Sequence, residues 1–562
     1  MGKLGRRALV LLVACLSLFV IAACGGDDDN GGSSSSGSSG EAKDGGSITI
    51  SQTSQPDYMD PALTYTVNGI EPLWLVYTPL ITYAREEGQA GAKLIPGLAE
   101  ALPDISADGK TYKLKLRSGL KYSDGTPVKA SDFEHAIKRV LNLESGGSAF
   151  YLVIEGAQDY LDAGKADGDI SGITTDDKTG DITIKLTGPD GSFTHVLAMW
   201  FAGLVPGDTP FKNLTKDPPP GVGPYMVTES VPNRQFVLER NKEYDKNPID
   251  GIPSGHIDKI TTKIIKSPQR QAQDVISGKL DYMQDPPPAD LKPEVKAKYS
   301  DRYEEITTAS TYYMFMNTRV PPFDDPKVRE AVNWGIDKPG LARLFAGEVA
   351  PGCSFLPPGV PGFDEALDVE DCPWGNPNEP PDLEKARALI KEAGVDGMDV
   401  TVWSNNDDPS DKVGEAYADM LSKMGFNAKP KILDGGVYFQ TIGNQKTKAQ
   451  TGFANWFQDF PHPKNFMFLV DGKSIQPTNN QNFGNVDDPE ITKGIAELNK
   501  EPDLTKAEGD WKDLNRKLVE RAWIVPYGHR KLATFVSERM DFENCTRFHP
   551  VYFNDYSSFC LK

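Results

Sequence analysis

The side chains that most often carry out catalysis or hold metals are scattered along this sequence. The six histidines are His135, His195, His256, His462, His529 and His549. No two of them have the helical spacing of a metal site, and the H-E-x-x-H, G-x-S-x-G, P-loop and G-x-G-x-x-G motifs do not occur. Hydrolysis would need a nucleophile with its base, or an activated water. We therefore expect no catalytic site, no metal and no cofactor.

Four cysteines beyond the N-terminal region indicate an oxidising compartment. Cys353 and Cys372 lie close together in the sequence, as do Cys545 and Cys560. Of the three connectivities that four cysteines allow, the local one closes two short loops. Each bridge would stabilise the fold by about 3 kcal/mol. A zinc site is the alternative, although no spacing contains a C-x-x-C pair, and we favour the two local disulfides.

The N-terminus has the parts of an export signal. Lys3, Arg6 and Arg7 precede an apolar run over residues 8–23, which is short for a membrane span. The run ends in Ile-Ala-Ala-Cys24, which resembles the bacterial lipobox, whose cysteine becomes the lipidated first residue of the mature protein. We predict a signal peptide over 1–23 and a lipid anchor on Cys24. An ordinary signal peptide with an incidental cysteine is the alternative.

A polar tether and an acidic body follow the anchor. Residues 24–44 are rich in Gly, Ser and Asp, a composition that cannot bury a core. The chain would thus be held on the outer face of the cytoplasmic membrane, in a periplasm or at the cell surface. Its formal net charge of −20 argues against nucleic acid as a partner. Its length predicts several domains.

The rest of the chain mixes strand and helix signals. Alternating apolar residues predict strands at 112–116, 182–186 and 260–264. Ser131 and Glu134 have the spacing of a capping box before a helix. Asp325-Pro326 and Asp382 mark the starts of two more helices, the second ending at Gly394. These signals predict a mixed α/β fold.

Seven sequence blocks in order resemble the extracellular solute-binding proteins of peptide and nickel ABC importers, family 5. They are TYKLKLRSGLKYSDGTPVKASDF (111–133), GVGPY (221–225), LERNKEY (238–244), SGKLDY (277–282), TYYMFMNTRVPPFDDPKVREAVNWGIDK (311–338), DLEKARALIKEAG (382–394) and WFQDFPHPKNF (456–466). The block at 311–338 is the most specific. Together the blocks extend over most of the chain after the tether.

The resemblance implies a two-lobed α/β fold like that of periplasmic binding proteins, with the ligand cleft between the lobes. Lobe I would comprise 45–72, 205–309 and 523–562, with an inserted subdomain at 73–204. Lobe II would comprise 310–522. Such lobes close around a solute by a hinge motion.

The resemblance also implies the ligand-binding residues. Peptide binders of the family hold the N-terminal ammonium on an aspartate three residues after a tryptophan, here Asp459 after Trp456. Because side chains alternate along a strand, at least one of the adjacent rings of Trp456 and Phe457 would face the cleft. Asn455 would supply backbone hydrogen bonds beside them. Tyr58 and Asn68 would face the cleft from lobe I. The alternative is that Asp459 only turns the chain before the prolines that follow it.

The expected function is capture of a peptide, or of another small molecule, by a monomer that delivers it to the permease and ATPase subunits of an ABC importer. The same importer role with an oligosaccharide, a metal chelate or another small solute is the alternative, and the aromatic residues after Trp456 would suit stacking on sugars. A secreted hydrolase and a receptor for signalling peptides are further alternatives.

Overall fold

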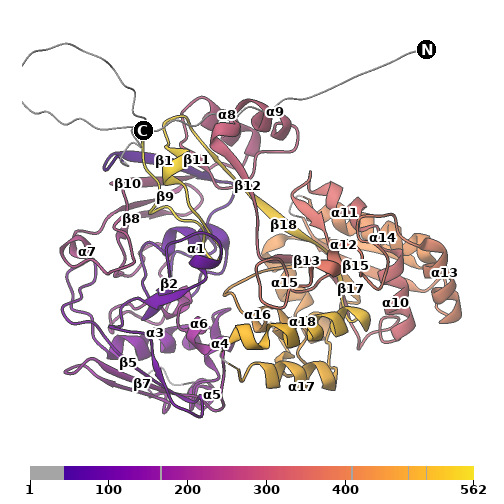
Figure 1. Ribbon diagram of the computed structural model, residues 1–562, viewed down its shortest axis with the longest axis horizontal. Helices are drawn as coiled ribbons and strands as arrows, with labels where there is room; N and C mark the ends of the chain where they lie inside the picture. The colour runs from indigo at the N-terminus through magenta and orange to yellow at the C-terminus, as the bar shows by residue number, and fades with distance from the viewer. Residues whose placement is uncertain (1–42, 165–167, 407–408, 479, 502) are drawn as a thin grey trace, which may run out of the picture. The chain divides into compact units, whose positions relative to one another are not determined.

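The structure is a computed structural model, and it describes residues 43–164, 168–406, 409–478, 480–501 and 503–562 (Figure 1). The predicted signal peptide, the lipidation site at Cys24 and nearly all of the tether lie outside these residues. In the described part of the chain, no helix has the length and apolar character to cross a membrane.

Two groups of buried apolar residues divide the fold. One large core is built from residues between Ala309 and Tyr527, and we call the part around it lobe II. Three further cores are built mainly from residues before Tyr303 and from the C-terminal segment, and we call the part around them lobe I. Phe460, from the chain between two lobe II elements, packs into a core of lobe I. The lobes therefore share apolar contacts as well as chain connections.

One long strand joins the sheets of the two lobes. The largest sheet has the strand order β16-β15-β17-β13-β18-β11-β1-β10-β9-β8, with β12 and β14 also paired to β18. Strand β18 (Val525–Val536) pairs with β13 on the lobe II side and with β11 and β12 on the lobe I side. Its position between the lobes is visible in Figure 1. The chain crossings at 308–309 and at β18 therefore lie side by side, since Thr308 N donates to Arg530 O at 2.9 Å.

Lobe II carries helices on a mixed sheet. Its strands are β13 (Ser310–Met316), β14 (Val349–Pro351), β15 (Asp399–Asn405), β16 (Asn427–Leu433) and β17 (Thr451–Phe457). Its helices are α10 (Pro326–Gly335), α11 (Lys338–Leu344), α12 (Glu365–Val369), α13 (Leu383–Glu392), α14 (Ser410–Met424), α15 (Gly435–Ile442), α16 (Lys464–Met467), α17 (Pro489–Leu498) and α18 (Leu504–Glu520). The predicted caps of α10 and α13 form, because Asp325 accepts from Lys327 N at 2.9 Å and Asp382 from Lys385 N at 2.9 Å.

Lobe I consists of its part of the large sheet and smaller units before and after it. Its strands in the large sheet are β1 (Ser47–Gln52), β8 (Tyr225–Val231), β9 (Gln235–Arg240), β10 (Lys259–Ile264), β11 (Tyr282–Met283) and β12 (Tyr303–Thr307), with helices α1 (Val67–Leu73), α7 (Lys242–Lys246), α8 (Pro268–Ile276) and α9 (Lys292–Lys298). The C-terminal segment adds α19 (Phe542–Cys545), β19 (Phe548–His549) and β20 (Phe553–Asn554).

A separate four-stranded sheet with the order β4-β5-β7-β6 lies within lobe I. The elements of this region are β2 (Ile81–Tyr83), β3 (Leu94–Pro96), β4 (Asp104–Ile105), β5 (Thr111–Lys115), β6 (Ile173–Asp176), β7 (Asp181–Lys185), α2 (Gly88–Gly91), α3 (Ser131–Asn142), α4 (Ser148–Tyr151), α5 (Ala157–Ala163) and α6 (Phe193–Val196). Short 3₁₀ helices occupy Trp200–Ala202, Ser300–Arg302, Gln445–Thr447, Phe468–Val470 and Gly472–Ser474.

The predicted capping box at α3 is wrong. The helix already includes Ser131, whose Oγ donates to Asp177 at 3.0 Å. Glu134 accepts from Ile170 N at 2.9 Å and pairs with Lys138 at 2.8 Å. Tertiary partners therefore replace the local cap.

The four cysteines form two disulfides, Cys353–Cys372 and Cys545–Cys560, which is the local pairing. The first lies in lobe II after β14. The second ties α19 to the end of the chain.

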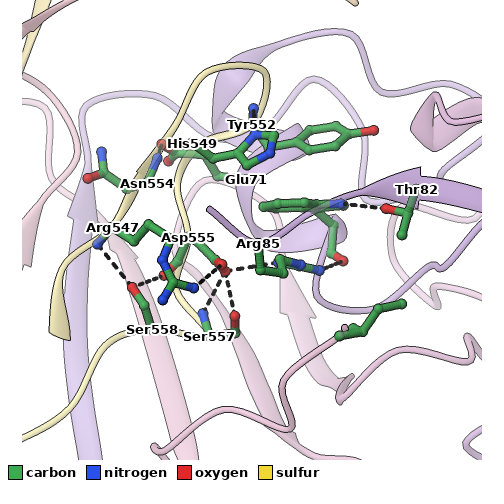
Figure 2. A network of polar contacts seen from close by, with 12 residues as sticks. Glu71, Thr82, Arg85, Arg547, His549, Tyr552, Asn554, Asp555, Ser557 and Ser558 are labelled. Carbon is green, nitrogen blue, oxygen red and sulfur yellow. Dashed lines mark hydrogen bonds and ion pairs between the residues drawn. The ribbon is translucent and has the colours of Figure 1, made fainter. Parts of the chain in front are cut away.

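A buried ion pair fastens the C-terminal segment to the chain after β2. Arg85 Nη1 lies 2.9 Å from Asp555 Oδ1, and the Arg85 guanidinium lies 3.3 Å above the ring of Trp74 (Figure 2). The backbone N of Ser557 also donates to Asp555, at 3.0 Å. His549 Nε2 lies 2.9 Å from the carbonyl O of Gly91. Since both members of the ion pair are buried, each depends on the other for compensation of its charge.

We predict that Arg85→Met lowers the free energy of unfolding by about 3 kcal/mol, because the buried Asp555 carboxylate then keeps only the partly exposed Arg547, whose Nη1 lies 3.8 Å from Asp555 Oδ2. Urea unfolding of the purified protein measures this change. In the matched control, Lys115→Met breaks a pair with Glu100 whose side chains are 53% and 46% exposed, and we expect a loss below about 1 kcal/mol. Equal losses in both variants would contradict the prediction.

Candidate functional site

The end of β17 carries the predicted binding residues. β17 pairs antiparallel with β13, placing Phe457 opposite Ser310 and Asn455 opposite Tyr312. Gln458 N donates to Ala309 O at 2.9 Å, which extends the pairing by one residue. The chain then leaves the sheet, and Asp459 stands at this exit.

Asp459 is a buried carboxylate held by neutral groups. Asp459 is only 4% exposed. Its Oδ2 accepts from Tyr65 OH at 3.1 Å and from Asn465 Nδ2 at 2.8 Å. Its backbone N donates to Asn465 Oδ1 at 2.8 Å. Tyr65 belongs to lobe I and Asn465 to lobe II, so the carboxylate lies where the lobes meet.

The electrostatics of Asp459 are those of an uncompensated anion. Burial raises its pKa to about 7, and the hydrogen bonds from Asn465 and Tyr65 oppose this rise only in part. In the described residues, no lysine or arginine forms an ion pair with it. A cation delivered here would remove the penalty of burying the charge.

Aromatic rings from both lobes surround the carboxylate. The ring of Tyr65 lies 5.4 Å from Phe201 and 6.4 Å from Trp456. Trp456 Nε1 donates to Asn465 Oδ1 at 3.2 Å, and its ring lies 5.1 Å from Phe468. These rings give the charged group an apolar surrounding, which strengthens its electrostatic interactions.

The loop before α1 positions Tyr65, a residue that the sequence did not single out. Asp57 accepts from the backbone N of Tyr65 at 2.7 Å and from Thr64 Oγ1 at 2.8 Å. The loop is thereby folded back on itself, so that the phenol points across to lobe II. The one sequence signal is an aromatic residue between two threonines, which does not reveal its distant partner.

The other predicted residues have different surroundings. Phe457 is half-buried and its ring lies 6.1 Å from Phe553, on the lobe I side. Asn455 is half-buried on β17. Asn68 Nδ2 donates to Ser54 O at 3.1 Å, and Tyr58 is half-buried in the same loop region. Neither Tyr58 nor Asn68 hydrogen-bonds to the 455–459 segment among the described contacts. Asp459 and Trp456 are therefore brought together with Tyr65 rather than with these two residues.

A second set of polar contacts joins the lobes beside the aromatic rings. Lys464 forms an ion pair with Asp190, which also accepts from Asn499 Nδ2 at 2.9 Å. Burial alone would raise the pKa of Asp190, but the charge of Lys464 and the hydrogen bonds from Lys464, Ser192 and Asn499 together outweigh it, and the pKa is lowered. His195 stacks on Phe460 with a centroid distance of 6.2 Å, and burial lowers its pKa to about 4. At neutral pH this histidine acts as an uncharged packing group.

A two-lobed α/β fold with a carboxylate between its lobes is the architecture of an extracytoplasmic solute-binding protein. Residues 93–477 match the family described as bacterial extracellular solute-binding proteins, family 5. The chain belongs to this family.

Curated relatives and solved structures agree with this assignment. The chain is 28% identical over 434 residues to the oligopeptide-binding protein OppA of Bacillus subtilis, covering 73% of this chain and 75% of the relative. It is 27% identical over 405 residues to the dipeptide-binding protein of Escherichia coli, covering 66% and 69%. The structure of the clavulanic acid biosynthesis oligopeptide binding protein 2 superposes with a TM-score of 0.83 at 27% identity, covering 92% of this chain and 96% of that one.

We predict that Asp459→Asn changes stability in a pH-dependent way in the ligand-free protein. The carboxyl pKa is about 3.9 in an unfolded chain and about 7 in the fold. Between these two pKa values the folded state binds a proton on Asp459 that the unfolded state does not. The contribution of this carboxyl to stability therefore falls as pH rises from about 4 to about 7.

The Asn variant lacks this loss. The melting temperature of the variant minus that of the original protein should therefore be larger at pH 8 than at pH 5. Calorimetry at both pH values measures the difference. Asp104→Asn, at an exposed position of β4, controls for removal of a charge. An Asp459→Asn difference that is the same at both pH values would show that the carboxylate is not buried without compensation.

Proposed function

We propose that this protein captures peptides through their N-terminal ammonium group and delivers them to the membrane subunits of an ABC importer. The observation that carries the proposal is the Asp459 carboxylate, buried between the lobes with only neutral partners. The names of the relatives, oligopeptide- and dipeptide-binding proteins, support a peptide as the solute.

The geometry explains how an ammonium would be recognised. A carboxylate has about four lone-pair sites, and Tyr65 and Asn465 occupy two of them, so about two remain for N–H donors of the ligand. Charge-assisted hydrogen bonds of this kind are about twice as strong as neutral ones. The rings of Tyr65 and Trp456 would cover the ligand from the two lobes. Because the partners of Asp459 come from both lobes, an ammonium bound there favours the closed arrangement.

The proposal also includes the mode of action, the localisation and the lobe boundaries of the protein. The protein binds its solute without catalysis, acts as a monomer, and is exported and held at the membrane through a lipid on Cys24. Lobe I takes 45–72, 205–309 and 523–562, the inserted subdomain 73–204, and lobe II 310–522. The core built from Ala309 to Tyr527 supports the extent of lobe II.

We predict that a tripeptide with a free N-terminus binds at least about 100-fold more tightly than its N-acetylated form, since acetylation removes the cation that Asp459 requires. Asp459→Asn should weaken the free peptide by a similar factor and leave the acetylated peptide nearly unchanged. Isothermal titration calorimetry measures both, with Asp104→Asn as the control. Equal affinities for the two peptides would refute the proposal, and a sugar that binds in their place would support the oligosaccharide alternative.

We also predict proton exchange on binding, with a sign that depends on pH. Near pH 6 the Asp459 carboxyl, with its pKa of about 7, is largely protonated, so an incoming ammonium displaces close to one proton. Above about pH 8 the free peptide amine is largely neutral in solution and takes up a proton instead. Titrations in phosphate and Tris buffers separate these terms by the difference in binding enthalpy. Proton release that persists in Asp459→Asn would assign it to another group.

A further inference from the structure

Strand β18 changes its pairing partners from one lobe to the other between two neighbouring residues. Residues 525–530 pair with β13 and β14 of lobe II. Residues 531–536 pair with β12 and β11 of lobe I. The change therefore falls between Arg530 and Lys531, and we call this place the strand junction. A bend of β18 at the strand junction turns one lobe against the other.

A chain of ion pairs crosses the strand junction. Lys292 Nζ, on α9 of lobe I, lies 2.9 Å from Glu305 Oε1 on β12 and 3.3 Å from Glu348 Oε1. Glu348 directly precedes β14 of lobe II. Its Oε2 lies 3.3 Å from Arg530 Nη2, and Arg530 Nη1 donates to Tyr312 OH at 2.9 Å. The Lys292–Glu348 ion pair therefore joins lobe I to lobe II directly.

The charged groups of this chain are largely shielded from water. The side chains of Lys292, Glu348 and Glu305 are 5%, 12% and 15% exposed. Burial alone would raise the pKa of Glu305, but hydrogen bonds from two lysines and a tyrosine outweigh it and lower the pKa to about 2. Glu305 is therefore ionised at neutral pH. Ion pairs at this depth interact more strongly than exposed pairs and are less screened by salt.

Lys292 decides the sign of the electrostatic interaction at the strand junction. Glu305 and Glu348 both lie within 3.3 Å of its nitrogen, so they would repel each other if this cation were removed. The two carboxylates also move with different cores. Val295 of α9 is buried in a core of lobe I, and Val349, next to Glu348, is buried in the core of lobe II. A change in the angle between the lobes therefore changes the energy of the Lys292–Glu348 ion pair.

We propose that Lys292 is a hinge brace, which stabilises the closed arrangement of the lobes through its ion pair with Glu348 before any ligand binds. The Tyr65–Asp459 hydrogen bond across the lobes is formed in the same structure as this ion pair. No described hydrogen bond or ion pair links the brace to Asp459, so the two act on closure separately.

The consequence of the brace concerns every solute alike. The apparent affinity of a ligand depends on the fraction of the protein that is already in the binding-competent arrangement. An ion pair that raises this fraction strengthens binding without touching the ligand. The inference goes beyond the proposed function, since it holds whatever the solute is.

Deletion of the central charge, followed by rescue, tests the brace. Spin labels are attached at the exposed positions Lys113 on β5 and Lys391 on α13 through a ketone-bearing amino acid, which leaves the cysteines unchanged. Pulsed electron paramagnetic resonance then measures the distances between the labels in the full chain without added ligand. The population whose distance matches this structure is counted as closed. Lys292→Met is compared with the double variant Lys292→Met/Glu348→Gln.

We expect Lys292→Met to lower the ratio of closed to open protein by about tenfold, because attraction between the lobes is replaced by repulsion. The double variant should recover part of this loss, since Glu348→Gln removes the repulsion. Lys296→Met is the matched control, because it takes a lysine from the same Glu305 carboxylate but within lobe I. It should change the ratio by less than about twofold.

The proposal is overturned if the original protein has no closed population, if Lys292→Met leaves the ratio unchanged, or if Lys296→Met lowers it equally. A loss without recovery in the double variant also overturns it, since the effect would then come from lost packing. Glu348→Gln alone leaves Lys292 paired with Glu305 and should lower the ratio in the same direction, so it replaces Lys292→Met if that variant does not fold. No peptide enters the measurement, and failure of peptide capture at Asp459 would therefore appear separately.

Discussion

The ion pair between Arg85 and Asp555 is the contact on which the arrangement of lobe I depends. It joins a residue near the start of the fold to one near its end, 470 positions apart in the sequence. The guanidinium is compensated twice, by the carboxylate and by the face of Trp74. With Asp555 anchored, the C-terminal segment is fixed against the chain after β2, and that surface is where lobe II approaches.

Asp459, in contrast, is buried without a charged partner. Where Arg85 meets its counter-charge inside the fold, Asp459 is buried with neutral partners only, and its raised pKa is the consequence. Burial with neutral partners does not by itself mark a binding carboxylate, as Glu71 shows. Glu71 is 2% exposed, accepts from Gln284, Tyr556 and Asn554, and burial raises its pKa to about 7. Those partners all lie in lobe I, whereas the partners of Asp459 come from both lobes. The position between the lobes is therefore what distinguishes Asp459.

Local signals in the sequence predicted local structure well and distant contacts poorly. Asp325 and Asp382 cap their helices as expected, because the acceptor and donor lie within three residues of each other. Ser131 and Glu134 have the same kind of spacing, yet each finds a partner far along the chain. Asp459 was predicted through the family resemblance, whereas Tyr65 was not, since its role rests on a contact across 394 positions. No periodicity or spacing encodes such a contact.

The pattern of burial along β18 connects the site to motion. The strand is buried at both ends, but Arg530, Lys531 and Leu532 in its middle are only half-buried. The other chain crossing between the lobes, at 308–309, lies beside this half-buried part of β18, since Thr308 N donates to Arg530 O at 2.9 Å. Bending at these adjacent positions would disturb less packing than bending inside either lobe. If the lobes open by bending at these positions, the Asp190–Lys464 ion pair and the Tyr65–Asp459 hydrogen bond, both formed across the lobes, would separate. A cation at Asp459 adds its interaction to the closed side alone, which is the condition for a ligand to shift such an equilibrium.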